Sequence, residues 1–141
     1  MSKIRSYRDL IVWQRGMALA TLCYAKTGSF PKSEKFGLVS QIRRAAVSVP
    51  ANIAEGNGRE NTSAYIQFLR IAQGSLKELE THTLISQSVG MMNATDTDLV
   101  LEECEQVGKL LRSPIRGYRI GKKDDLLPLF LFPTHSQARE R

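Results

Sequence analysis

The amino-acid sequence predicts an all-α protein, built as an antiparallel up-down-up-down bundle of four helices. Apolar residues recur at spacings of three and four along four long segments, and no segment alternates as a strand does. Short stretches rich in Gly, Pro and Asn separate these segments. The chain has 141 residues, 42% of them hydrophobic, which suits one packed domain. We expect residues 1–120 to form the bundle and residues 121–141 a tail, either poorly ordered or docked on a neighbouring subunit.

The first helix is expected over residues 9–24, with Asp9 as its N-cap. Gly28 and Pro31 mark its end and the start of the next segment. Apolar residues at helical spacing define one face of this helix, which we expect to point into the core. The residues of this face are Leu10, Trp13, Met17, Ala20 and Tyr24.

The second helix is expected over residues 33–55 and is apolar on more than one side. Val47 lies opposite the core face, which comprises Leu38, Ile42, Ala45, Val49 and Ile53. A helix that is apolar nearly all round is buried on more than one side, so we expect a subunit interface here. Pro50 removes one backbone hydrogen bond and is expected to kink the helix. The residues assigned to the interface are Val39, Ala46, Val47 and Ala51.

The third helix is expected over residues 62–88, after a turn at residues 56–59. The fourth begins near Thr95, which with Asp98 resembles an acidic capping box, and Pro114 is expected to bend its last turns. Both helices carry one apolar face at helical spacing. The third helix presents Tyr65, Phe68, Leu69, Ala72, Leu76, Leu79 and Thr83, and the fourth presents Val100, Cys104, Val107, Leu111, Ile115 and Tyr118.

Basic residues are concentrated at the two ends of a chain whose formal net charge is +6. Residues 60–105 hold two basic and eight acidic groups, while the segments on either side are basic. Guanidinium groups bind phosphate through two parallel hydrogen bonds, so this pattern favours contact with a nucleic-acid backbone. The alternative is that the arginines pair with acids of the middle segment, within a subunit or across an interface. The candidate phosphate-binding residues are Arg43, Arg44, Arg59, Arg112, Arg116 and Arg119.

No catalytic constellation assembles from the sequence, so we expect a non-enzymatic protein without a cofactor or a metal ion. The Glu-x-x-His pairs of di-iron bundles are missing, and no phosphate-binding loop is present. Cys23 and Cys104 are expected to be small core residues, and Glu78 with His82 a surface pair. No segment has the roughly 20 apolar residues that cross a bilayer, so we expect a cytoplasmic protein without membrane contact.

Several segments resemble the four-helix-bundle proteins encoded in intervening sequences of bacterial 23S ribosomal RNA genes. The resemblance is carried chiefly by residues 9–14, 30–31, 37–38 and the long motif at residues 41–56, QIRRAAVSVPANIAEG. It continues through residues 65–81 and residues 110–116, and covers about residues 6–119.

The resemblance implies a bundle that assembles into a homopentameric ring. These proteins are similar to the accessory proteins of diversity-generating retroelements, whose basic rings engage nucleic acid and a reverse transcriptase. The resemblance and the basic residues together predict a non-enzymatic homopentamer that binds RNA or DNA. The alternative is a protein-interaction scaffold, or an accessory factor for a nucleic-acid enzyme such as a reverse transcriptase.

Overall fold

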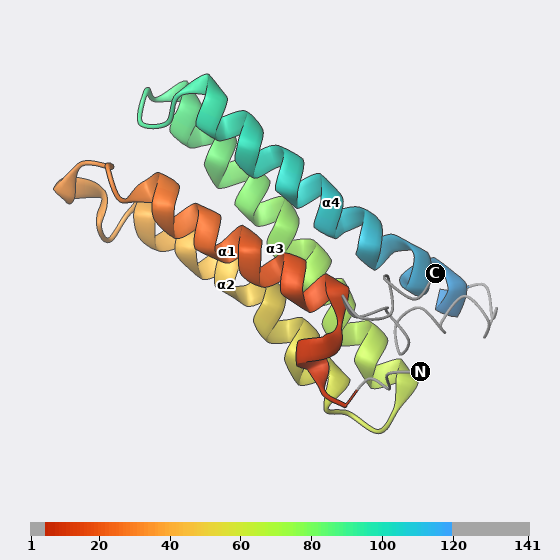
Figure 1. Ribbon diagram of the computed structural model, residues 1–141. Coiled ribbons are helices and arrows are strands. Elements are labelled where there is room, and N and C mark those ends of the chain that lie inside the picture. The colour runs from red at the N-terminus through yellow and green to blue at the C-terminus, as the bar shows by residue number, and fades with distance from the viewer. Residues whose placement is uncertain (1–4, 120–141) are drawn as a thin grey trace, which may run out of the picture.

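Four long antiparallel helices make up the computed structural model (Figure 1). The structure describes residues 5–119, and these contain no strand. The elements are the 3₁₀ helix η1 (Tyr7–Asp9), α1 (Ile11–Thr27), the 3₁₀ helix η2 (Lys32–Glu34), α2 (Leu38–Asn57), α3 (Thr62–Ser88) and α4 (Ala94–Arg119). The prediction of an all-α four-helix bundle is confirmed, while the predicted tail at residues 121–141 lies outside the described residues.

Each helix of the bundle packs against the next along the chain, and α1 packs against α4 to close it. The α1 N-terminus, the α2–α3 turn and the α4 C-terminus therefore share one end of the bundle (Figure 1). The largest fully buried side chains lie along the shared axis and come from all four helices. They include Leu19, Ile42, Ile53, Leu69, Leu79 and Leu111.

The buried face of α1 is not the predicted one. Leu10 and Ala20 are buried as expected and Trp13 is half-buried, but Met17 and Tyr24 are exposed. The central buried positions of the helix are instead Val12, Gly16, Leu19, Cys23 and Thr27. α2 lies close to this face at Gly16, where a Cβ atom would be only 3.3 Å from Cβ of Pro50.

Two predicted helix caps are also wrong, because neighbouring residues provide the bonds. The Asp9 carboxylate accepts hydrogen bonds from the backbone of Arg5, at 2.8 Å, and of Ser6, at 3.3 Å. Asp9 thus closes a capping box on η1, and α1 starts two residues later. At the start of α4, Oδ1 of Asn93 accepts from the backbone N–H of Asp96 at 2.7 Å, in the place assigned to Thr95 and Asp98.

In α2, two of the four predicted interface residues are buried within the subunit. Ala46 is completely buried and Val39 nearly so, whereas Val47 and Ala51 are exposed. The flank that carries Val39 and Ala46 faces α1, which covers it. The predicted core face of α2 is otherwise buried, with Leu38 half-buried, and the helix continues through Pro50 to Asn57.

The predictions for α3 and for the core face of α4 are largely confirmed. α3 has the predicted bounds, and every residue of its expected face is buried except the half-buried Phe68. On α4 the expected face is buried except for the half-buried Tyr118, and the helix extends through Pro114. A polar contact joins α2 to α3, where the hydroxyl groups of Ser48 and Ser75 lie 2.8 Å apart.

Two helical glycines are expected to respond in opposite ways to the same substitution. A Cβ atom at Gly56 would lie 2.6 Å from Cβ of Phe68, so Gly56→Ala forces α2 and α3 apart. We expect it to lower the free energy of unfolding by about 1–3 kcal/mol, as overpacking does. A Cβ atom at Gly74 would meet no atom within 4 Å. Gly74→Ala should therefore raise the free energy of unfolding by about 0.5–1 kcal/mol through helix propensity alone.

Urea denaturation of the two variants beside the parent protein measures both changes. A stability unchanged or raised by Gly56→Ala would contradict the close packing of α2 against α3 at this position.

Candidate nucleic-acid interface

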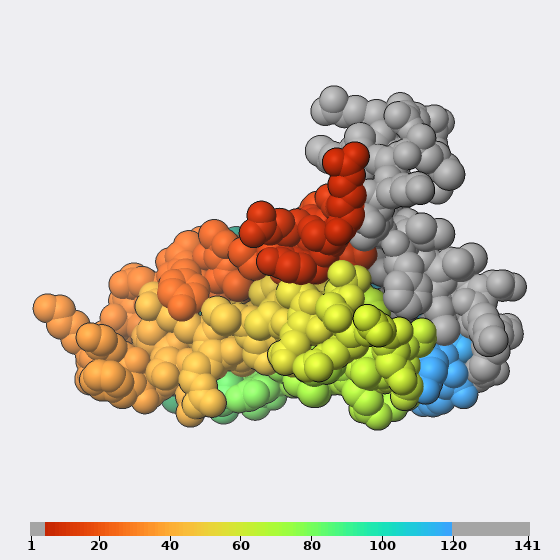
Figure 2. Space-filling model, turned by 90° about the horizontal axis from the view of Figure 1, so that it is seen from below, coloured from red at the N-terminus to blue at the C-terminus, as the bar shows by residue number. Residues whose placement is uncertain are grey.

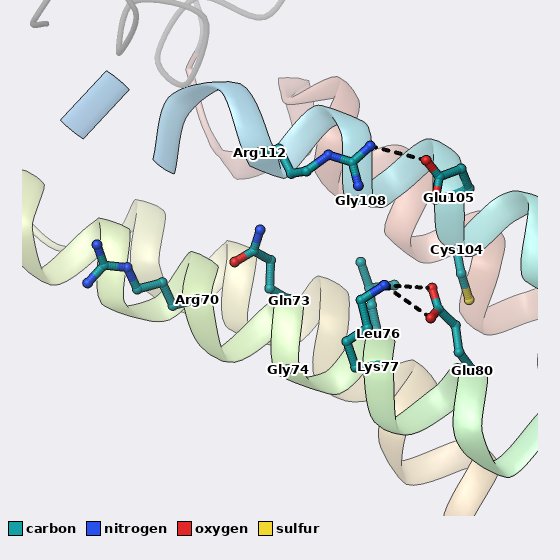
Figure 3. A pocket seen from close by; sticks show the side chains of 10 residues that line it. All are labelled: Arg70, Gln73, Gly74, Leu76, Lys77, Glu80, Cys104, Glu105, Gly108 and Arg112. Atoms are coloured by element: carbon teal, nitrogen blue, oxygen red, sulfur yellow. Dashed lines mark hydrogen bonds and ion pairs between the residues drawn. The ribbon is translucent and has the colours of Figure 1, made fainter. Parts of the chain in front are cut away.

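A hollow of about 310 Å³ lies between α3 and α4 (Figure 3). Arg70, Gln73 and Lys77 line it from α3, and Arg112 lines it from α4. Gly108 forms part of the α4 wall, and its missing side chain leaves the hollow open beside Leu76. The two walls therefore bring basic side chains from two helices to one concave surface.

A second hollow, of about 420 Å³, continues the first toward the C-terminal end of α4. It shares Gln73 and Arg112 with the first hollow and adds Ile115, Arg116 and Arg119. We call the two hollows together the α3/α4 groove. Its arginines are Arg70 from one wall and Arg112, Arg116 and Arg119 from the other.

Ion pairs neutralise one half of this groove. Nη2 of Arg112 donates to Oε1 of Glu105 at 3.1 Å, and Nζ of Lys77 lies 3.1 Å from Oε2 of Glu80. The hydrogen bond and the charge of Arg112 hold the pKa of the Glu105 carboxyl below its usual value. Within residues 5–119, Arg70, Arg116 and Arg119 form no ion pair. The other half of the groove therefore carries positive charge that no acid of residues 5–119 compensates.

The helical spacing of Arg112, Arg116 and Arg119 correctly placed them along one side of α4. Arg70 was not among the predicted residues, because it stands isolated in the acidic middle segment. One signal was present in the sequence: Arg70 precedes Gln73 by three residues and Lys77 by seven, so the three lie on one side of a helix. Only the packing of α3 against α4 shows that this side faces the arginines of α4.

Two other candidates, Arg43 and Arg44, lie on α2 and do not line the groove. Nε of Arg43 donates to Oγ1 of Thr27 at 3.0 Å, and its guanidinium carbon lies 4.4 Å from the centre of the Tyr24 ring. Arg43 thus fastens α2 to the end of α1, and its role as a phosphate ligand stays a prediction. Arg44 is exposed and lines a separate hollow beside Phe36.

The remaining candidate, Arg59, is held at the turn between α2 and α3. Its Nη2 atom lies 3.4 Å from Oε1 of Glu55, one helical turn earlier, and its guanidinium covers the ring of Phe68 at 5.1 Å. Arg59 shares an end of the bundle with the α4 C-terminus but does not line the α3/α4 groove. The six predicted arginines therefore do not form one surface.

The cysteine and histidine side chains of the described residues lie in surroundings that fit a structural role. Cys23 and Cys104 are buried, as predicted, and burial raises the pKa of the Cys23 thiol to about 12. Both thiols stay protonated at neutral pH and are poor nucleophiles. Nε2 of His82 lies 3.4 Å from Oε1 of Glu78, which confirms the predicted pair. No group of three or more His, Cys, Asp or Glu side chains within residues 5–119 is arranged to hold a metal ion.

A second surface of interest lies between α1 and α2, which run side by side on the face shown in Figure 2. Its lining is mostly apolar. A hollow of about 330 Å³ there is lined by Met17, Ala20, Thr21, Tyr24, Val47 and Pro50. Phe36, which is 87% exposed, lines an adjoining hollow together with Tyr24 and Val47. The basic side chains of Lys35, Arg43 and Arg44 border that hollow. We call this surface the α1/α2 apolar face. None of the described helices is long and apolar enough to span a bilayer.

These features define a four-helix-bundle protein with an arginine-rich groove and an exposed apolar face. Residues 8–113 match the 23S rRNA-intervening sequence protein family, and the chain belongs to this family. A similar solved structure is a protein of unknown function from the S23 ribosomal protein family of Bacteroides thetaiotaomicron. It is 21% identical, covers 75% of this chain and 99% of its own, and superposes with a TM-score of 0.68, which shows a shared fold. No curated protein matches the sequence significantly.

Proposed function

We propose that this protein is a non-enzymatic nucleic-acid-binding protein that holds RNA or DNA by its phosphates in the α3/α4 groove. The observation that carries the proposal is the position of Arg116 and Arg119. They lie in one groove with Arg70 and Arg112, and no acid of residues 5–119 neutralises them. Arginine binds phosphate through two parallel hydrogen bonds, which gives such a groove both affinity and orientation. The family description, which refers to 23S rRNA intervening sequences, supports a nucleic-acid partner.

The composition of the groove favours contact with the backbone over recognition of bases. No aromatic ring lines the α3/α4 groove within the described residues, so no platform for stacking bases is available there. Phosphate contacts position a nucleic acid without reading its sequence. We therefore expect weak sequence preference and strong dependence on salt.

For the assembly we propose a homo-oligomer, with the pentameric ring that the resemblance implies. The α1/α2 apolar face supports this proposal because it exposes Met17, Tyr24, Phe36 and Val47 on one side of the bundle. Of the predicted interface residues, Val47 and Ala51 are exposed and fit this role. A ring repeats the α3/α4 groove in every subunit, which raises the avidity for a long nucleic acid.

A second candidate function is a protein-interaction scaffold, such as an accessory factor for a reverse transcriptase. The exposure of Phe36 beside the exposed Tyr24 and Val47 favours it, because contiguous apolar side chains on a surface are typical of a protein-binding site. In this case the arginines of the groove pair with acids of a protein partner or of a neighbouring subunit.

Titration of the purified protein against structured RNA and duplex DNA at several salt concentrations separates the two functions. On duplex DNA we expect the logarithm of the binding constant to fall with the logarithm of salt, with a slope of about −0.9 for each neutralised phosphate. Contact of three or four arginines with phosphates predicts a slope of about −3 per bound subunit. Absence of binding even at low salt would overturn the nucleic-acid proposal and favour the scaffold.

A further inference from the structure

One acidic side chain is bonded directly to an arginine of the groove. Glu105 and Arg112 are seven residues apart on α4, about two helical turns, and join through a hydrogen bond of 3.1 Å. To make this bond, Arg112 lies back along the helix past Gly108 (Figure 3). A Cβ atom at Gly108 would lie 3.6 Å from Nη1 of Arg112, so the missing side chain leaves room for the guanidinium.

The pair formed by Glu105 and Arg112 is easily broken. Both side chains are about half exposed, and ion pairs at exposed positions contribute little free energy. Arginine binds phosphate more strongly when two hydrogen bonds form in parallel, and the structure gives this pair a single hydrogen bond. A phosphate that enters the groove can therefore bind Arg112 more strongly than Glu105 does.

The dimensions of the groove match more than one phosphate. Arg112 and Arg119 are seven residues apart, so they span about 10 Å of helix axis. One strand of duplex DNA presents a phosphate about every 3.4 Å along its axis, or about three phosphates over that span. A nucleic-acid strand therefore supplies several negative charges at once, while Glu105 supplies one.

We propose that Glu105 is an intramolecular competitor of the nucleic acid, and that an entering phosphate displaces it from Arg112. In the free protein Glu105 occupies Arg112, while no acid of residues 5–119 pairs with Arg70, Arg116 or Arg119. In the complex Arg112 joins them as a further phosphate ligand, and the Glu105 carboxylate turns to solvent. This inference rests on the proposed function and adds to it the residue that sets the affinity of the groove.

The test is the affinity of Glu105→Gln for a short structured RNA and a short DNA duplex at fixed salt. We expect binding to tighten roughly two- to fivefold, the equivalent of losing one exposed ion pair from the free protein. Glu102→Gln is the matched control, because Glu102 is exposed on the same helix, makes no ion pair within residues 5–119 and lines no part of the groove. Both variants raise the net charge by one, and only Glu105→Gln releases Arg112.

The same comparison in an Arg112→Ala background isolates the pair. We expect the advantage of Glu105→Gln over Glu102→Gln to disappear there, because no guanidinium remains to be released. A persistent advantage would show that Glu105 acts by simple repulsion and would overturn the displacement.

The two proposals fail in distinguishable ways. If the parent protein binds no nucleic acid, the proposed function is wrong and this inference falls with it. If the parent binds and Glu105→Gln gains no more than Glu102→Gln, the function stands and the competition is wrong. Circular-dichroism melting of each variant confirms that the helices are intact.

Discussion

Arg116→Glu combined with Arg119→Glu is expected to weaken the binding of structured RNA and duplex DNA by about 100-fold or more at constant salt. Each charged hydrogen bond to a phosphate contributes about 1.5–3 kcal/mol, and every 1.4 kcal/mol is a tenfold change. The double substitution removes two such groups and adds two charges that repel phosphate. Fluorescence anisotropy of a labelled nucleic acid measures the loss, and the salt slope on duplex DNA should shrink by about 1.8.

The matched control reverses two charges at the other end of the bundle. Lys32→Glu with Lys35→Glu changes the net charge equally, and both lysines are exposed on or beside η2, far along the bundle from the α3/α4 groove. We expect this control to weaken binding only slightly, through the long-range field of the protein. An equal loss in both variants would mean that overall charge, and not the groove, holds the nucleic acid.

Stability of the charge-reversed protein requires a separate check. Arg116 and Arg119 make no ion pair within the described residues, so their replacement breaks no ion pair there. However, a glutamate in the last turns of α4 opposes the helix dipole and costs about 0.3–1 kcal/mol at each position. The helices should therefore melt at a slightly lower temperature and remain fully formed where binding is measured.

The success of the sequence analysis follows the strength of the apolar pattern in each helix. α3 carries seven core residues at regular spacing between a clear turn and Gly90, and its bounds were predicted correctly. In α1 large side chains such as Met17 and Tyr24 suggested a face that the fold leaves exposed. The true face holds Gly16 and Thr27, whose burial depends on the close approach of α2 and cannot be read from hydrophobicity.

The candidate site was predictable only where one helix carries it. The spacing of Arg112, Arg116 and Arg119 along α4 sufficed to place them together. Assigning Arg70 to the groove depends on which side of α3 meets α4, and this is a property of the packed bundle. The engagement of Arg43 with Thr27 and Tyr24 likewise joins residues brought together by the packing of α2 against α1, so sequence spacing could not separate it from the open arginines.

The predicted interface on α2 was likewise only partly predictable from one helix. An all-round apolar helix indicates a second buried side but does not say which neighbour buries it. For Val39 and Ala46 that neighbour is α1 of the same subunit. Val47 is only partly covered by the elements of residues 5–119 and stays 43% exposed. We propose that a second subunit covers the rest of it.

Val47→Glu is expected to convert the proposed oligomer into monomers of 15.8 kDa. Val47 is 43% exposed at the centre of the α1/α2 apolar face, between the two hollows that it helps to line. Moving a carboxylate from water into a subunit contact carries a desolvation cost that an exposed helical charge pair offsets only in part, and a ring multiplies that cost by the number of interfaces. Light scattering coupled to size exclusion measures the mass directly, with five copies expected for the parent protein.

The fold of the variant should survive, because the monomer tolerates this glutamate. Arg43 precedes it by four residues and Arg44 by three, positions at which opposite charges stabilise a helix slightly. Ile85→Glu is the matched control, since Ile85 is also 43% exposed but belongs to α3, away from the α1/α2 apolar face. A parent mass retained in Val47→Glu would refute an interface on this face. Dissociation by Ile85→Glu alone would place the contact on α3 instead, and the apolar face between α1 and α2 would then be left for a different protein partner.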